Sequence, residues 1–226
     1  MNDFQGRVAI VTGAAGVLGR AVAAEFARRG ARLALIDIVA IDGPHTSHVC
    51  DLGDATACSA TVRRIRETCG RIDALANVAG GFTMGEAVHE TSDATWRHMM
   101  DLNAGTVLNM ARAVVPHMLE TGGGRIVNVA ARAGLRGAAR MGAYAASKSV
   151  VIRLTEALAE ELKGKGINVN CVLPSIIDTE RNRADMPGSD PAKWVAPADL
   201  ARVIAFLASD DARAIHGAAV PVEGLS

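Results

Sequence analysis

Short apolar runs rich in β-branched residues recur along the chain and alternate with longer segments of helical periodicity. The apolar runs span residues 7–12, 32–37, 72–78, 125–130, 167–173 and 218–222. Each run is bounded by glycine or polar residues and is apolar at consecutive positions, a pattern that predicts a strand buried on both faces.

Three intervening segments, 17–29, 144–163 and 197–208, gather apolar residues on one helical face. These are Leu18, Val22, Ala23 and Phe26 in the first, Val151, Leu154, Leu158 and Leu162 in the second, and Leu200, Ile204 and Leu207 after Pro197 in the third. The alternation predicts a doubly wound α/β fold, with a parallel sheet of six or seven strands and helices on both faces. Segment 38–49 offers Gly, Pro and polar residues where a full helix is expected. That crossover should therefore be abbreviated.

Composition narrows the class of protein. The chain has 226 residues, 50% of them hydrophobic, which favours one domain over residues 1–226. Lys and Arg (24) balance Asp and Glu (24), so the charge predicts no nucleic-acid partner and no anionic membrane surface. No apolar stretch reaches the roughly 20 residues that span a bilayer, and residues 1–5 do not resemble a signal peptide. We expect a cytoplasmic protein.

Cysteine and histidine spacing indicates neither a disulfide framework nor a metal site. Cys50, Cys58, Cys69 and Cys171 form no CxxC pair and are predicted to be reduced, mostly buried thiols. The six histidines show no zinc-binding spacing, so no metal is expected.

A glycine-rich turn between the first strand and the first helix predicts a dinucleotide site. Gly13, Gly16 and Gly19 permit a tight turn and close approach of backbone N–H groups to a pyrophosphate at the helix N-terminus. Asp37 ends the second strand, 18 residues after Gly19, where an acid accepts hydrogen bonds from the ribose. Because no basic residue stands nearby to pair with a 2′-phosphate, the sequence favours NAD over NADP.

The chain's single tyrosine lies four residues before a lysine, as Tyr144 and Lys148. On a helix this spacing places the two side chains one turn apart on the same face. A lysine ammonium should pull the tyrosine pKa down from about 10, so that the phenol can exchange a proton with substrate. We therefore expect Tyr144 and Lys148 to be catalytic.

Taken together and in order, these motifs resemble the short-chain dehydrogenase/reductase family over nearly the whole chain. The resemblance implies a Rossmann-type fold, cofactor contacts from the turn and later segments, and a third catalytic residue, Asn103, that shapes a water relay to Lys148. The implied cofactor-binding residues are Gly13, Ala15, Gly16, Val17, Leu18, Gly19, Asp37, Asp51, Leu52, Asn77, Ala79, Gly80, Tyr144, Lys148, Pro174 and Thr179. Asp51 would meet the adenine, Lys148 the nicotinamide ribose and Thr179 the carboxamide.

One departure from the family pattern bears on chemistry. The family's catalytic serine lies thirteen residues before the tyrosine, and here that position is Ala131. The hydroxyl that would hold and polarise a substrate carbonyl is missing, a loss of about 3 kcal/mol in the transition state. Neither Ser147 nor Ser149 has the spacing to replace it.

Three features resemble the dihydropteridine reductase-like branch of the family: Ala131, the short crossover after Asp37, and the pattern of residues 178–187 followed by Trp194. We expect Ala131 and Trp194 on the substrate side. The resemblance favours an NAD(H)-dependent reductase of a small electron-poor acceptor, such as a quinonoid dihydropteridine or a quinone. An ordinary alcohol/ketone dehydrogenase, such as a 3-oxoacyl reductase, and a non-catalytic nucleotide-binding scaffold or sensor remain open as alternatives.

Two expectations concern partners. Arg132, Arg136 and Arg140 precede the tyrosine helix beside the expected entrance for substrate, where they would either attract an anionic substrate or simply be solvated.

The helical segments 93–119 and 144–163 carry more apolar surface than one sheet face covers. The family resemblance implies that they pair with a second subunit, giving a homodimer or homotetramer.

Overall fold

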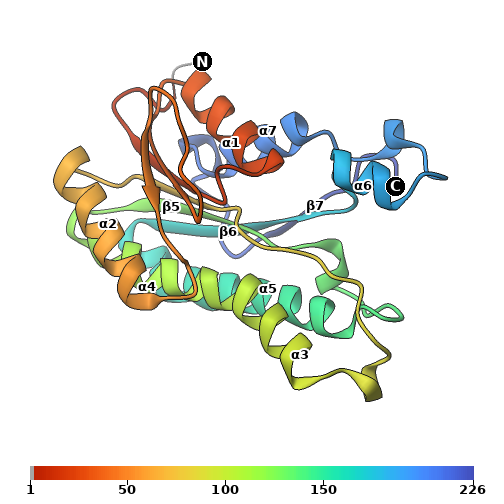
Figure 1. Cartoon of the computed structure of the whole chain (residues 1–226). Helices are drawn as coiled ribbons and strands as arrows, with labels where there is room; N and C mark the ends of the chain where they lie inside the picture. The colour runs from red at the N-terminus through yellow and green to blue at the C-terminus, as the bar shows by residue number, and fades with distance from the viewer. Residues whose placement is uncertain (1–2) are drawn as a thin grey trace.

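Seven parallel strands form the central sheet of the computed structural model, which describes residues 3–226 (Figure 1). The spatial order is β3-β2-β1-β4-β5-β6-β7. Strands β2 and β3 are added on one side of β1 and strands β4 to β7 on the other, so the strand order reverses between β1 and β4. The strands are β1 (Val8–Thr12), β2 (Arg32–Asp37), β3 (Thr46–Val49), β4 (Ala74–Asn77), β5 (Gly124–Val129), β6 (Ile167–Pro174) and β7 (Ala219–Val222). This is the doubly wound α/β fold that the sequence predicts.

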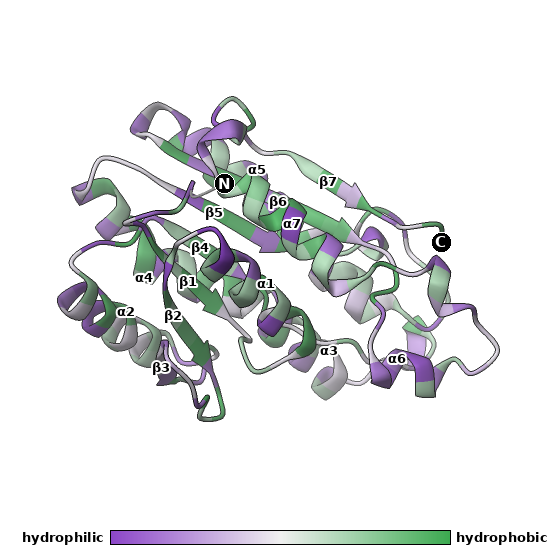
Figure 2. Ribbon diagram, turned by 90° about the horizontal axis from the view of Figure 1, so that it is seen from above, coloured by the Kyte–Doolittle hydropathy of each residue, from purple (hydrophilic) through white to green (hydrophobic). Residues whose placement is uncertain are grey.

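Helices cover both faces of the sheet. On one face lie α1 (Val17–Arg28) and α7 (Pro197–Leu207), and on the other α2 (Ala55–Cys69), α4 (Thr106–Glu120) and α5 (Gly142–Leu162) (Figure 1). In β1, Ala9 and Val11 pack toward the first layer, whereas Val8 and Ile10 pack toward the second. Every residue of β1 is buried, which explains its unbroken apolar sequence, and Figure 2 shows the hydrophobic colouring of the central strands.

Segment 38–49 contains no helix, as predicted, but it adds a strand that the apolar pattern did not indicate. Strand β3 pairs in parallel with β2 from Thr46 opposite Ala34 to Val49 opposite Asp37. It is mostly exposed, because it is the edge strand and only one neighbour covers it.

Helix α2 is a second element that the apolar pattern did not indicate. A capping residue marks its start: Asp54 accepts hydrogen bonds from the backbone N–H groups of Thr56 and Ala57.

The predicted helical segment 93–119 is interrupted near its middle. Helix α3 (Asp93–Met100) passes into a π-helical turn over Asp101–Gly105 before α4 begins. Such turns are rare and occur often at functional sites.

The predicted apolar stripe on α5 is partly wrong. Val151 and Leu162 are buried, but Leu154 and Leu158 are only half-buried. Ile152, Thr155 and Ala159 take the inner face instead. The helix is therefore rotated relative to the prediction and leaves leucine side chains on its outer flank.

All four cysteines are free and buried, as predicted. Among residues 3–226, no helix is long and apolar enough to cross a membrane. The same part of the chain brings together no group of three or more His, Cys, Asp or Glu side chains that could hold a metal ion.

Candidate active site

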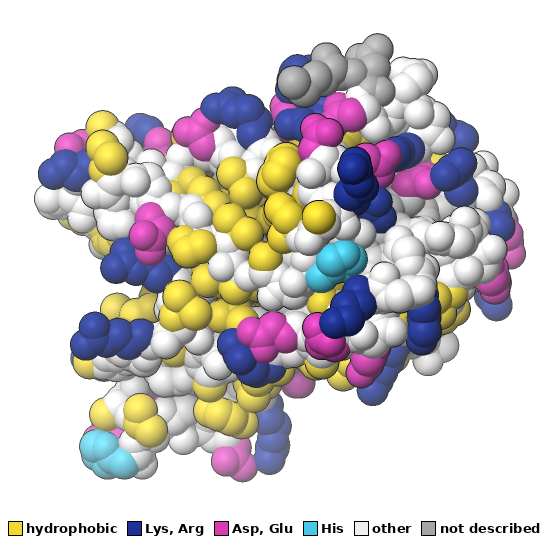
Figure 3. Space-filling model, turned by 180° about the vertical axis from the view of Figure 1, so that it is seen from behind, with side chains coloured by type: hydrophobic (Ala, Val, Ile, Leu, Met, Phe, Trp, Pro, Cys, Tyr) yellow, Lys and Arg dark blue, Asp and Glu magenta, His cyan; other side chains and the backbone are white. Residues whose placement is uncertain are grey.

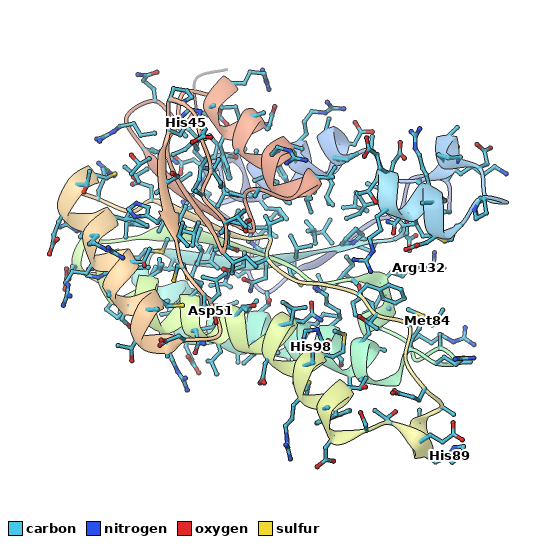
Figure 4. The ribbon with its side chains drawn as sticks, viewed as in Figure 1. His45, Asp51, Met84, His89, His98 and Arg132 are labelled. Atoms are coloured by element: carbon cyan, nitrogen blue, oxygen red, sulfur yellow. The ribbon has the colours of Figure 1, made fainter. Side chains whose placement is uncertain are left out.

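A large cavity opens along the carboxyl ends of the strands. Its volume is about 1,840 Å³, and it runs from the glycine turn after β1 to the segment after β6. In Figure 4, Asp51 lies toward one end of this region, and Met84 and Arg132 lie toward the other. In open α/β sheets, ligands bind at this edge and at the point where the strand order reverses, here between β1 and β4.

The glycine turn is built to bring backbone close to a ligand. Gly13 has a φ of +61°, which glycine adopts without steric cost. A Cβ at Gly19 would overlap the carbonyl oxygen of Gly13 and lie 2.7 Å from Cα of Ala14. Gly16 is the N-cap residue of α1 and offers no side chain to its first turn, so first-turn N–H groups remain available to an anion. The turn therefore fits a pyrophosphate, as the sequence predicts.

Asp37 is fixed beside this turn by hydrogen bonds from three backbone N–H groups, those of Ala15, Ile38 and Val39. Its Oδ2 accepts from the N–H of Ala15 at 2.9 Å, and its Oδ1 accepts from the N–H of Ile38 at 2.8 Å. The carboxylate lines the cavity together with Ala15 and Ile38. A negative charge is thus held at the position expected for the adenosine ribose.

Most of the predicted cofactor residues line the cavity. They are Gly13, Ala15, Gly16, Val17, Leu18, Gly19, Asp37, Asp51, Leu52, Ala79, Gly80, Tyr144, Lys148, Pro174 and Thr179. Thr179 also caps helix α6 (Glu180–Asp185) by accepting from the N–H of Asn182. These residues come from seven separate segments that only the fold brings together.

Asn77 is the exception, because its side chain lies within the sheet, and its contact with the cofactor stays a prediction. The side chain is 2% exposed and does not line the cavity. Its Nδ2 donates to Oδ1 of Asn128 at 2.8 Å, and Asn128 donates in turn to Oγ1 of Thr155 at 2.9 Å. Asn77 therefore links the sheet to α5, which carries the tyrosine and lysine.

Tyr144 and Lys148 both line the cavity, one turn apart on α5. The Phe82 ring meets the Tyr144 ring edge to face, with centroids 4.9 Å apart. Lys148 Nζ donates to the carbonyl oxygen of Val129 at 3.0 Å. This carbonyl belongs to the residue directly after Asn128, which forms the last pair between β5 and β4.

The predicted depression of the tyrosine pKa is wrong for this structure. Burial raises the pKa of Tyr144 to about 12, and burial lowers the pKa of Lys148 to about 8. Desolvation disfavours the charged form of each group, and here it outweighs any stabilisation of the phenolate by the ammonium. The site therefore holds a neutral phenol, which can act as a proton donor.

Asn103 lies in the π-helical turn and is fully buried. Its Oδ1 accepts from the N–H of Gly81, and its Nδ2 donates to the carbonyl of Gly81 and to Ser147 Oγ, each at 3.1 Å. A Cβ at Gly80 would lie 2.8 Å from Asn103 Oδ1 and 3.2 Å from Lys148 Nζ. The Asn103 side chain thus clamps the 80–81 segment to α5 and does not itself line the cavity.

Ala131 follows the end of β5, is 5% exposed and lines the cavity. Neither nearby serine supplies the missing hydroxyl. Ser147 Oγ donates to the carbonyl of Tyr144 at 2.7 Å and is buried, and Ser149 does not line the cavity. Ser175 does line it, but its Oγ donates to the carbonyl of Glu223 at 2.8 Å.

Trp194 does not line the cavity, and its place on the substrate side stays a prediction. The side chain is 7% exposed and lies beyond α6, at the end of the short helix Pro191–Lys193. The sequence did not indicate several other residues that line the cavity. Away from the glycine turn, at what we call the substrate end, they are Phe82, Met84, Met141, Ile176 and Met186. They come from loops without periodicity, so only their positions beside Gly81, Tyr144 and Thr179 could have identified them.

The known proteins to which this chain is similar include several dehydrogenases. Residues 7–189 match the family model described as short chain dehydrogenase. The chain is 35% identical to D-threitol dehydrogenase of Mycolicibacterium smegmatis and 34% identical to meso-2,3-butanediol dehydrogenase of Serratia marcescens, over 98% of this chain and 94% of each relative. Carveol dehydrogenase from Mycobacterium avium, solved in complex with NAD, superimposes with a TM-score of 0.89 at 29% identity, covering 99% of this chain and 98% of that one.

Proposed function

The chain belongs to the short-chain dehydrogenase family, a family of oxidoreductases, and we propose that it transfers hydride between NAD(H) and a small, electron-poor, conjugated acceptor. The observation that carries this choice of substrate is Ala131, a buried methyl group where a carbonyl-polarising hydroxyl would stand. A quinonoid dihydropteridine or a quinone is conjugated and electron-poor, so it needs less polarisation than a ketone before it accepts hydride.

The roles of the chain's own residues follow from their positions. The nicotinamide, when bound, supplies or takes up the hydride. Tyr144, held neutral by burial, donates a proton to the reduced substrate and retrieves it in the reverse direction. Lys148 offers an N–H to the nicotinamide ribose from its place beside the Val129 carbonyl. Asn103 holds the 80–81 segment against α5, which carries both residues.

A second candidate is an ordinary alcohol/ketone dehydrogenase. The similarity to D-threitol and meso-2,3-butanediol dehydrogenases favours it, since the names of both relatives specify alcohol substrates. A non-catalytic scaffold is disfavoured because Tyr144 and Lys148 face one cavity with Asn103 clamped behind them. The four free, buried cysteines support a cytoplasmic location, which stays a proposal.

A screen of acceptors tests the proposal directly. NADH oxidation by the purified protein is followed with quinonoid dihydropterin, 1,4-naphthoquinone and simple aliphatic ketones. We expect the first two to be reduced far faster than the ketones. Faster reduction of ketones would favour the second candidate instead.

Nucleotide choice gives a separate prediction. We expect NADH to bind at least about tenfold more tightly than NADPH, because the fixed Asp37 carboxylate would face the 2′-phosphate at a cost of about 1–4 kcal/mol. Calorimetric titration with both nucleotides measures the ratio. Asp37→Ala should narrow the difference, and equal affinities in the unaltered protein would contradict the prediction.

Assembly of copies of this chain is a further part of the proposal. Trp96 on α3 is 45% exposed, and Leu154 and Leu158 on α5 are half-buried, so both helices present apolar side chains outward. Figure 3 shows a second group of apolar side chains on the opposite side of the molecule from the view of Figure 1. Phe206 of α7 is also 40% exposed. Uncovered apolar faces and sheet edges favour association.

We expect light scattering to report a dimer or tetramer at micromolar concentration. Leu158→Glu should weaken the contact through α5, whereas Glu161→Gln on the same helix should not. A stable monomer of the unaltered protein would contradict this prediction.

A further inference from the structure

Apolar side chains gather at the substrate end of the cavity and are left open to solvent. Phe82 and Met84, on the segment after β4, are 41% and 57% exposed. Met141 and Met186 line the same end from the start of α5 and the end of α6. An exposed apolar surface inside a concave site indicates a binding surface for an apolar ligand. Methionine sulfur and the Phe82 ring both make favourable contacts with aromatic rings.

The three arginines of the loop between β5 and α5 have different surroundings. Arg132 is paired with Glu223 at 3.1 Å and donates to the carbonyl of Ser226. Arg140 does not line this cavity, and its Nε donates to the carbonyl of Gly85 at 3.2 Å. Arg136 does line it, and within residues 3–226 its side chain has neither a salt bridge nor a hydrogen bond.

Other charges around the cavity do not neutralise Arg136. On helix α6, Asp185 faces Arg181 at 3.6 Å, and Glu180 lies near Arg183. Asp37 and Asp51 belong to the nucleotide end, beside the glycine turn and after β3. The substrate end therefore combines an open apolar surface with one arginine that no carboxylate of the described chain pairs with.

We propose that this end of the cavity binds a flat apolar ring bearing a carboxylate, with the ring on Phe82 and Met84 and the carboxylate on Arg136. A guanidinium pairs with a carboxylate through two parallel N–H donors, which adds geometric selectivity to the charge. The inference deepens the proposed function, because it assigns the substrate class of the same site. Of the three arginines in this loop, the inference assigns substrate specificity to Arg136 alone.

A matched pair of non-reacting ligands tests the subsite without any turnover. Naphthalene-2-carboxylate and the neutral naphthalene-2-carboxamide have nearly the same shape, so their affinities differ mainly through the charge. Calorimetric titration of the NADH-saturated protein should show the carboxylate binding about tenfold more tightly, and the ratio should shrink as salt rises. Arg136→Gln should remove the preference and Arg136→Lys should keep part of it. Arg63→Gln, which removes a similarly exposed charge on α2, should keep all of it.

Equal affinities in the unaltered protein, or a preference that survives Arg136→Gln, would overturn the inference. The acceptor screen separates this outcome from failure of the proposed function. Reduction of 1,4-naphthoquinone without any carboxylate preference would refute the subsite alone. An Arg136-dependent preference in a protein that reduces no quinone or pterin would support the subsite and refute the electron-poor acceptor.

Discussion

Lys148→Met is expected to slow hydride transfer sharply while making the folded protein more stable at pH 7. The substitution removes the N–H donor for the nicotinamide ribose and the cation beside Tyr144, so we expect turnover to fall about 10³-fold. Burial lowers the pKa of Lys148 to about 8, which means that the folded state bears a cost for holding this ammonium at neutral pH. An uncharged side chain of similar length avoids that cost.

The stability gain should be about 1 kcal/mol in urea unfolding at pH 7, because the relieved desolvation is partly offset by loss of the hydrogen bond to the Val129 carbonyl. The gain should also depend on pH. Between pH 8 and the unfolded pKa of 10.5, the unfolded chain binds more protons at this lysine than the folded protein does, so the unaltered protein gains stability as pH rises. The difference between variant and unaltered protein should therefore shrink across that range.

Lys163→Met is the matched control, because Lys163 is half exposed and paired with Glu160 at the end of the same helix. It should leave turnover and the pH dependence unchanged. A Lys148→Met protein that is less stable than the unaltered one at pH 7 would show that the buried ammonium carries no such cost.

Ala131→Ser is expected to raise reduction of simple ketones by up to about 100-fold and to leave reduction of quinonoid acceptors nearly unchanged. The new hydroxyl would donate to a developing oxyanion, a contribution of about 3 kcal/mol where the substrate needs it. Steady-state kinetics with both classes of acceptor measures the two effects. Ala133→Ser is the control, because it adds a hydroxyl to the cavity two residues along the same loop.

Two results would overturn the use of Ala131 to infer substrate class. In the first, ketones are already good substrates of the unaltered protein, which would show that the hydroxyl is dispensable. In the second, the unaltered protein reduces no acceptor and Ala131→Ser gives it activity, which would favour the nucleotide-binding scaffold.

Tyr144→Phe separates the acceptor classes in a second way. Ketone reduction should fall most, because the developing alkoxide depends on the neutral phenol for its proton. A reduced pterin can take a proton from water, so its formation should fall less. Equal losses with both acceptors would show that Tyr144 donates the proton in each case.

Sequence alone determined the elements whose signals are local. Strand β2 spans the predicted run, because its four central residues, 33–36, are buried and a strand covered on both faces needs apolar residues there. The glycine turn follows from the backbone conformation of Gly13 and the close packing at Gly19. Tyr144 and Lys148 share a helix face because four residues make about one turn, a relation that needs no tertiary contact.

Tertiary structure decided which side chains are desolvated and which reach the cavity. Burial in the fold raises the pKa of Tyr144, and Phe82, more than sixty residues earlier, packs against its ring. Asn77 turns into the sheet because Asn128 of the neighbouring strand accepts its hydrogen bond. Of three arginines in one loop, Glu223 and Gly85 engage two, and only Arg136 faces the cavity without a partner among residues 3–226. Such outcomes depend on groups far apart along the chain, so local periodicity and spacing carry no signal for them.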